Sequence, residues 1–289
     1  MSDWSDLHLP LTVGKYRLEA PLGNGAMAKI YRGVDATSAR PVAVKHLAAD
    51  APGHASSRKR FRREAKAVAK LRHPAIVEVV EWIETEAGDW LVMELIDGQS
   101  LEEMLVDGPI PPARVARLAR GILEGLGAAH AIDIVHRDLK ASNVMVTQGG
   151  DVKILDFGLV KRIGDGGSET RETGWSSGLT ANEVRVGTVA SMSPEQATGF
   201  PIDQRSDIFS LGTLLYELLT GISPFYDENT VQTLVNVCSQ RQVPACEQDP
   251  RIPGVFSDFV DTLLEKDPES RPGNAAAAIQ VLDSFAHRL

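Results

Sequence analysis

The chain has 289 residues, of which 43% are hydrophobic, so it can bury a sizeable core in one large domain or two small ones. Its formal net charge of −9 opposes nucleic acid as a main partner, because phosphate contacts need local positive charge. The sequence lacks an apolar run of the roughly 18 residues that a membrane helix needs, and no signal peptide opens it, so we expect a cytoplasmic protein with no membrane span.

The first third of the chain predicts strands and one helix. Residues 1–13 are expected to form a flexible tail, and alternation over Tyr16–Glu19 predicts a strand. Residues 22–30 contain glycines that let backbone N–H groups approach phosphate oxygens, although a plain hairpin turn is the alternative. Residues 41–45 predict an apolar strand that ends in a lysine, and residues 61–71 carry apolar side chains at helical spacing.

The middle of the chain begins with another buried strand, over residues 91–98, and then becomes helical. Pro111 and Pro112 start a helix, because proline is favoured in the first helical turn. Its apolar stripe is predicted to pack into a core and consists of Val115, Leu118, Ile122, Leu126 and Ala129.

The most informative stretch is 136–143, which reads His-Arg-Asp-Leu-Lys-Ala-Ser-Asn, followed by Asp-Phe-Gly at 156–158. The runs between them are rich in β-branched residues and flank a turn at 148–151, so they predict a hairpin. An antiparallel hairpin returns Asp156 to the neighbourhood of Asn143. Two oxygen ligands for Mg²⁺ beside a proton acceptor are what phosphoryl transfer from a nucleotide requires.

These motifs, in this order, resemble those of the protein kinase family, and the resemblance runs from about Gly14 to the end of the chain. It implies an α+β, two-lobe fold: a small antiparallel β-sheet lobe with one main helix over 14–94, and a mainly helical lobe over 95–289. The activation segment would be 156–195, and residues 164–185, rich in Gly, Ser, Thr and Glu, predict a mobile loop within it.

The resemblance implies that ATP binds in the cleft between the lobes. Lys45 would touch the α- and β-phosphates while paired with Glu64, Met93 would be the gatekeeper, and the backbone at Glu94 and Ile96 would hydrogen-bond adenine. The expected ATP-binding residues are Leu22, Gly23, Asn24, Gly25, Ile30, Ala43, Lys45, Glu64, Met93, Glu94, Ile96 and Met145.

The resemblance also assigns the chemistry to the second lobe. Asp138 would orient and accept the proton of a substrate hydroxyl, and Lys140 would neutralise charge on the moving phosphoryl group. Asn143 and Asp156 would hold Mg²⁺ or Mn²⁺.

Three further residues receive regulatory or substrate roles from the resemblance. Arg137 would pair with a phosphorylated residue of the activation loop, for which Thr180 is favoured and Thr173 is another candidate. Thr188 would shape the substrate site. The plainer alternative is that the loop hydroxyls only keep an exposed segment soluble.

Two structural anchors complete the resemblance. Glu195 would form a structural ion pair with Arg271, and residues 207–212 would anchor the central helix. The chain departs from the family pattern at five positions, none of which removes a charge that binds metal, phosphate or proton: Ala28, Ala141, Ser191, Ser193 and Phe209.

We therefore expect a Ser/Thr protein kinase of the bacterial, eukaryotic-like group that acts on protein substrates. The sequence does not indicate an oligomeric state. A nucleotide-binding pseudokinase scaffold is the first alternative, although it usually lacks the lysine, the acid or a metal ligand. A small-molecule phosphotransferase is the second, although it usually lacks the activation segment and the Arg271 partner.

Two other features of the sequence, a basic run and a pair of cysteines, have simple interpretations. The basic run at 58–63 is best explained as a solvated helix face, with a phosphate-sensing face and nucleic-acid binding as alternatives. Cys238 and Cys246 are expected to be reduced thiols, because further metal ligands are not apparent nearby.

Overall fold

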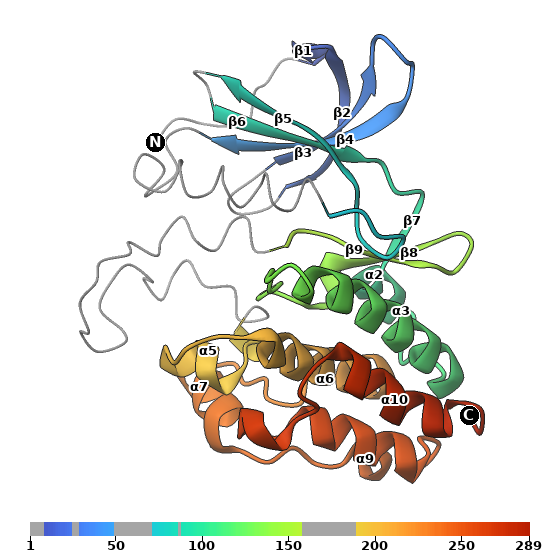
Figure 1. Cartoon of the computed structure of the whole chain (residues 1–289), viewed down its shortest axis with the longest axis vertical. Coiled ribbons are helices and arrows are strands. Elements are labelled where there is room, and N and C mark those ends of the chain that lie inside the picture. Colours follow the sequence, from blue (N-terminus) through green and yellow to red (C-terminus); the bar gives the residue numbers. More distant parts are fainter. Residues whose placement is uncertain (1–8, 25–28, 49–70, 86–87, 158–188) are drawn as a thin grey trace. The chain divides into compact units, whose positions relative to one another are not determined.

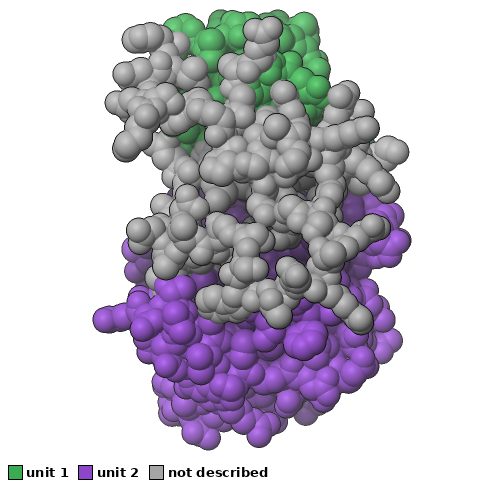
Figure 2. All heavy atoms as spheres, turned by 90° about the vertical axis from the view of Figure 1, so that its left-hand side faces the viewer, with its two compact units in different colours: residues 1–72, 77–97, 159–167 green, residues 73–76, 98–158, 168–289 purple. Residues whose placement is uncertain are grey.

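The computed structural model describes residues 9–24, 29–48, 71–85, 88–157 and 189–289 (Figure 1). The described residues fall into two compact units, coloured separately in Figure 2. Unit 1 takes those up to Arg72 and those from Val77 to Asp97. Unit 2 takes His73–Ile76 and those from Gly98 onward.

Unit 1 is built on one antiparallel sheet with the strand order β1-β2-β3-β4-β6-β5. Its strands are β1 (Leu11–Val13), β2 (Tyr16–Asn24), β3 (Lys29–Asp35), β4 (Pro41–Ala48), β5 (Val79–Thr85) and β6 (Gly88–Glu94). The core of the sheet gathers Tyr16, Leu18, Val44, Trp90 and Val92, all of them buried. The predicted strand at Tyr16–Glu19 is confirmed as the first half of β2.

The structure differs from the predicted tail at β1. Leu11–Val13 pairs with β2, and the side chain of Val13 is 5% exposed and packs into the core of the sheet. The physical reason is the alternation Leu11-Thr12-Val13, which is too short to stand out in the sequence but supplies an apolar face to the sheet edge.

Unit 2 is mainly helical and carries a small sheet of order β7-β8-β9. The strands are β7 (Gly98–Ser100), β8 (Val144–Thr147) and β9 (Val152–Ile154). The helices are α2 (Leu101–Leu105), α3 (Pro112–His130), α5 (Pro194–Thr198), α6 (Gln204–Thr220), α7 (Thr230–Ser239), α8 (Ala245–Gln248), α9 (Gly254–Leu263) and α10 (Ala275–Ala286), with 3₁₀ turns at Ala141–Asn143 and Pro268–Ser270.

Helix α6 forms the centre of unit 2. Nearly every residue from Ser206 to Leu219 is buried, and the helix contacts both α3 and α9. A Cβ atom added at Gly212 would lie 2.9 Å from side-chain atoms of Leu263 and Leu264, so glycine is required for this close approach. The predicted apolar stripe of α3 is confirmed, because all five of its members are buried.

One other sequence prediction has a clear outcome in unit 2. The predicted hairpin is present, with Val144 paired to Ile154 and Val146 to Val152. Among the helices in the described ranges, none is long and apolar enough to cross a membrane.

Candidate active site

The carboxylate of Asp207 on α6 binds the backbone at the start of the stretch 136–143. One carboxylate oxygen of Asp207 accepts hydrogen bonds from the N–H of His136 and from Nε2 of His130, both at 2.8 Å, and the other accepts from the N–H of Arg137 at 2.8 Å. Arg137 has φ = +67°, a left-handed conformation that costs a non-glycine residue free energy. The buried carboxylate therefore holds a strained backbone in place.

His136 connects this loop to the segment after β9. Its Nδ1 accepts a hydrogen bond from the N–H of Asp138 at 3.2 Å, and its Nε2 lies 2.7 Å from the carbonyl oxygen of Leu155. Because Nδ1 acts as an acceptor, the proton resides on Nε2 and donates to Leu155. The ring of His136 also meets Phe157 edge to face, with centroids 4.8 Å apart. The buried imidazole thus joins the two predicted motifs.

Asp138, Lys140 and Asn143 are brought together in unit 2, as the sequence predicted. Oδ2 of Asp138 lies 3.2 Å from Nζ of Lys140 and also accepts a hydrogen bond from Nδ2 of Asn143 at 3.2 Å. The side chains of Asp138 and Lys140 are 20% and 26% exposed, so a substrate can reach them. Two donors on one oxygen orient the carboxylate.

The hairpin places Asp156 beside Asn143. The N–H of Leu155 donates to the carbonyl oxygen of Asn143 at 2.8 Å, one residue beyond the Val144–Ile154 pair, and Asp156 follows with φ = +53°. Nδ2 of Asn143 is bonded to both the backbone and the side chain of Asp138, which leaves the amide oxygen to ligate a cation. An amide oxygen and a carboxylate are hard ligands that suit Mg²⁺ with substrate phosphates. The residues therefore fit such an ion.

The predicted ion pair between Glu195 and Arg271 is confirmed. Nη1 and Nη2 of Arg271 bond the two carboxylate oxygens of Glu195 at 2.8 and 3.0 Å. The other three N–H groups of the guanidinium donate to the carbonyl oxygens of Glu265, Arg205 and Lys266. All five donors are engaged, and the side chain is fully buried. The pair ties α5 to α6 and to the turn after α9.

Two of the departures from the family pattern have a structural explanation. Ser193 caps α5: its Oγ accepts from the N–H of Gln196, and Oε1 of Gln196 accepts from the N–H of Ser193. Phe209 stacks on Phe225, with ring centroids 5.8 Å apart, and its face lies 4.9 Å from the guanidinium carbon of Arg271.

The residues predicted to contact ATP in unit 1 lie mostly on neighbouring strands. Ala43 and Lys45 on β4 pair with Met93 and Leu91 on β6, and Ile30 on β3 pairs with Lys45. Ala43, Lys45 and Met93 are 9%, 6% and 6% exposed. The sheet register therefore groups these residues.

The structure limits which backbone group of Glu94, the first expected adenine contact, could bind adenine. The N–H of Glu94 donates to the carbonyl oxygen of Glu78 at 2.9 Å, and the Glu94 carboxylate accepts from the N–H of Glu78 at 2.8 Å. Because this N–H is already bonded, the Glu94 backbone could meet adenine only by accepting a hydrogen bond at its carbonyl oxygen. Ile96, the other expected contact, lies just after β6 and is half-buried.

The remaining predicted positions divide into those that the structure describes and those it does not. Leu22 and Gly23 lie near the end of β2, which Asn24 completes, and Met145 lies on β8 in unit 2. The predicted positions outside the described residues are Gly25, Ala28, Glu64, Thr173, Thr180 and Thr188, together with the basic run at 58–63.

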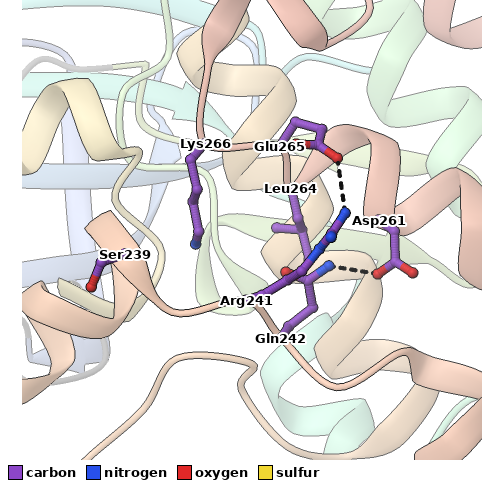
Figure 3. A pocket seen from close by; sticks show the side chains of 7 residues that line it. All are labelled: Ser239, Arg241, Gln242, Asp261, Leu264, Glu265 and Lys266. Carbon is purple, nitrogen blue, oxygen red and sulfur yellow. Dashed lines mark hydrogen bonds and ion pairs between the residues drawn. The ribbon is translucent and has the colours of Figure 1, made fainter.

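A pocket of about 220 Å³ lies elsewhere in unit 2, between the end of α7 and the end of α9 (Figure 3). Arg241 pairs with Glu265 at 3.5 Å, and Nε2 of Gln242 donates to Asp261 at 2.6 Å. Nζ of Lys266 lies 3.6 Å from the ring centroid of Phe225, and burial lowers the pKa of this amine to about 8. None of the predicted site residues lines this pocket, so it is separate from the candidate active site.

Comparison with known proteins gives one consistent result. The sequence pattern of the protein kinase domain matches residues 16–283. A probable serine/threonine-protein kinase of Streptomyces coelicolor is 40% identical over 264 residues, which cover 89% of this chain and 38% of that protein. The serine/threonine-protein kinase PknL of Mycobacterium tuberculosis is 36% identical over 288 residues, which cover 98% of this chain and 68% of PknL.

The fold agrees with this result. The crystal structure of Rad53 1-466 in complex with AMP-PNP matches with a TM-score of 0.71 and 27% identity, over 92% of this chain and 64% of that one. The predicted α+β, protein-kinase-like fold is thus confirmed. Because the kinase domain spans residues 16–283 and the relatives are named bacterial serine/threonine-protein kinases, this chain belongs to the protein kinase family.

Proposed function

We propose that the chain transfers the γ-phosphoryl group of ATP to serine or threonine hydroxyls of proteins in the cytoplasm. The observation that carries the proposal is the arrangement around Asn143. Its side-chain nitrogen is bonded to Asp138, and its backbone is bonded to the residue before Asp156. A proton acceptor and two oxygen ligands are thereby held together on one small sheet and its connecting loop.

In the proposed mechanism, Asp138 accepts a hydrogen bond from the substrate hydroxyl, orients it toward the phosphorus atom and receives its proton. Lys140, which already lies 3.2 Å from Asp138, offsets negative charge on the phosphoryl group as it moves. Asn143 and Asp156 would hold Mg²⁺ or Mn²⁺, which supplies positive charge at the phosphates. Positioning and electrostatics account for most of the rate, because phosphoryl transfer leaves the protein little covalent chemistry.

In unit 1, the proposal assigns ATP binding to the grouped residues of β3, β4 and β6. Lys45 lies inside β4, which continues to Ala48 rather than ending at the lysine as predicted, and the residue is only 6% exposed. Glu64 would keep the Lys45 ammonium charged and directed at the α- and β-phosphates.

The test is transfer of radiolabel from γ-labelled ATP to a generic basic protein, followed by identification of the labelled amino acids. We expect phosphoserine and phosphothreonine, a requirement for Mg²⁺ or Mn²⁺, and loss of transfer in excess chelator. Asp138→Asn keeps the shape but removes the proton acceptor, so transfer should fall by about 10²–10⁴-fold while ATP binding persists. A parent chain that binds ATP but transfers no label would instead be a pseudokinase.

A further inference from the structure

Arg137 precedes the proposed catalytic acid, and side chains from other elements bond both its N–H and its carbonyl oxygen. The N–H of Arg137 donates to Asp207, and its carbonyl oxygen accepts a hydrogen bond from Nε2 of Gln196 at 2.8 Å. The second bond matters for Asp138, because the carbonyl of Arg137 and the N–H of Asp138 lie in one rigid peptide plane. Fixing that carbonyl, together with the bond from the Asp138 N–H to His136, orients the peptide plane and so limits the directions open to the Asp138 side chain.

Gln196 is itself rigidly placed. Its Oε1 accepts from the N–H of Ser193 at 3.0 Å, and its own N–H donates to Oγ of Ser193 at 3.3 Å. This reciprocal arrangement is a capping box at the start of α5, and Ser193 is fully buried. With its oxygen engaged by the cap, the amide presents its nitrogen to Arg137.

A second capping box in the same unit shows that the cap does not require glutamine. At the start of α2, Ser100 and Glu103 make the same pair of bonds, with a carboxylate in place of the amide. Glutamate and glutamine serve this position equally well in helix caps. What only the amide can add is a donor, and at Gln196 that donor meets the Arg137 carbonyl.

We propose that Gln196 is a positioning residue for catalysis, which couples the end of the activation segment to Asp138 through the Arg137 peptide. The proposal rests on the function proposed above, in which Asp138 accepts the substrate proton. An ordered α5 holds the Arg137 peptide plane, and a displaced α5 releases it and lets a left-handed residue relax away from its strained conformation.

The discriminating variant is Gln196→Glu. It keeps the acceptor that caps α5 but replaces the donor with a carboxylate that faces the Arg137 carbonyl oxygen. The variant loses the hydrogen bond that holds the Arg137 carbonyl. Since one hydrogen bond is worth about one order of magnitude in an equilibrium or a rate, kcat for the protein substrate should fall roughly 10-fold at pH 8. KM for ATP should stay within about 2-fold, since the groups proposed to bind ATP keep their own contacts.

The split between kcat and KM separates positioning from a merely structural role. Between pH 6 and pH 8 the introduced carboxyl stays ionised, because its ordinary pKa is about 4.3 and the N–H bond of the cap favours the charged form, so the deficit should appear in kcat with KM for ATP unchanged across this range. Gln196→Met lacks both donor and acceptor, so it should also show a lower kcat. The matched control is Glu103→Gln, the reverse exchange in the other capping box, which should leave kcat within about 2-fold of the parent.

The outcomes are distinguishable from those of the proposed function, because Asp138→Asn is measured in the same assay. An inactive parent overturns both proposals. An active, Asp138-dependent parent with an equally active Gln196→Glu or Gln196→Met variant at pH 8 overturns this inference alone. So does a deficit of Gln196→Glu that appears in KM for ATP rather than in kcat, or one that Glu103→Gln reproduces.

Discussion

Replacement of Arg271 by methionine tests how much of unit 2 depends on one buried cation. The change removes the guanidinium but keeps an unbranched apolar side chain over the face of Phe209. Glu195, which is 7% exposed, then retains a side-chain hydrogen bond from Oγ of Ser206 at 2.6 Å but no opposite charge from Arg271. Three backbone carbonyls also lose their donor.

The expected cost follows from these losses. Removing one partner of a buried ion pair typically destabilises a protein by ~3–5 kcal/mol, because the other charge is left uncompensated. For a domain of this size that corresponds to a melting temperature lower by about 10 °C. The measurement is thermal and urea unfolding followed by circular dichroism at 222 nm, which reports the helices of unit 2.

The pH dependence of the loss has a defined sign. Burial by itself raises the pKa of the Glu195 carboxyl, but the hydrogen bonds from Arg271 and Ser206 outweigh it, and the pKa lies below its ordinary value. The parent therefore gains stability from this group above the unfolded pKa of about 4.3 and loses it as the pH falls. In Arg271→Met burial dominates, so protonation relieves the cost, and the difference between parent and variant should narrow from pH 7 to pH 4.5.

The control is Arg251→Met, the same chemical change at an arginine that is 83% exposed and paired with Asp249 at 2.7 Å. Solvent screens that pair, so little or no change in stability is expected. The reasoning about Arg271 would be refuted if both variants melted within a degree or two of the parent, or if the Arg271→Met deficit grew as the pH fell.

Two further predictions concern the proposed catalysis. Lys45→Met and Glu64→Gln should each lose activity because both maintain one ion pair on the phosphates, and the double variant should be little worse than Lys45→Met; strictly additive losses in a double-mutant cycle would count against a shared role. Incubation with ATP should place phosphate on Thr180, since a phosphate adds about −1.5 to −2 charge that can pair with Arg137. The prediction of Thr180 phosphorylation would be refuted if mass spectrometry found no phosphate between 164 and 185, or if the Thr180→Ala variant were fully active.

The local part of the candidate site could be predicted from the sequence. The β-branched residues in 144–146 and 152–155 and the turn between them are a short-range signal, and the hairpin they predicted does return Asp156 to Asn143. The buried stripe of α3 followed from its period for the same reason. Such predictions succeed because strand and helix periodicity are set by the residues of the element itself.

The long-range part of the site could not be predicted from residue patterns. The bond from Gln196 to Arg137 spans 59 positions and that from His130 to Asp207 spans 77, and such partners are chosen by the packing of α3, α5 and α6. A signal for Gln196 was nevertheless present. Ser193 followed three residues later by glutamine is the spacing of a capping box, although in the family comparison Ser193 stood out only as a departure from alanine.

The two anchors of α5 lie on adjacent residues, and this links stability to catalysis. Glu195 is held by Arg271, and Gln196 holds the Arg137 peptide, so a loosened Glu195 should also loosen the peptide that precedes Asp138. Arg271→Lys tests this link, because it keeps the positive charge but cannot supply five planar donors. At 25 °C, where the variant remains folded by circular dichroism, kcat should fall several-fold while KM for ATP changes little. A folded Arg271→Lys with the parent's kcat would show that the ion pair supports the fold without reaching the catalytic acid.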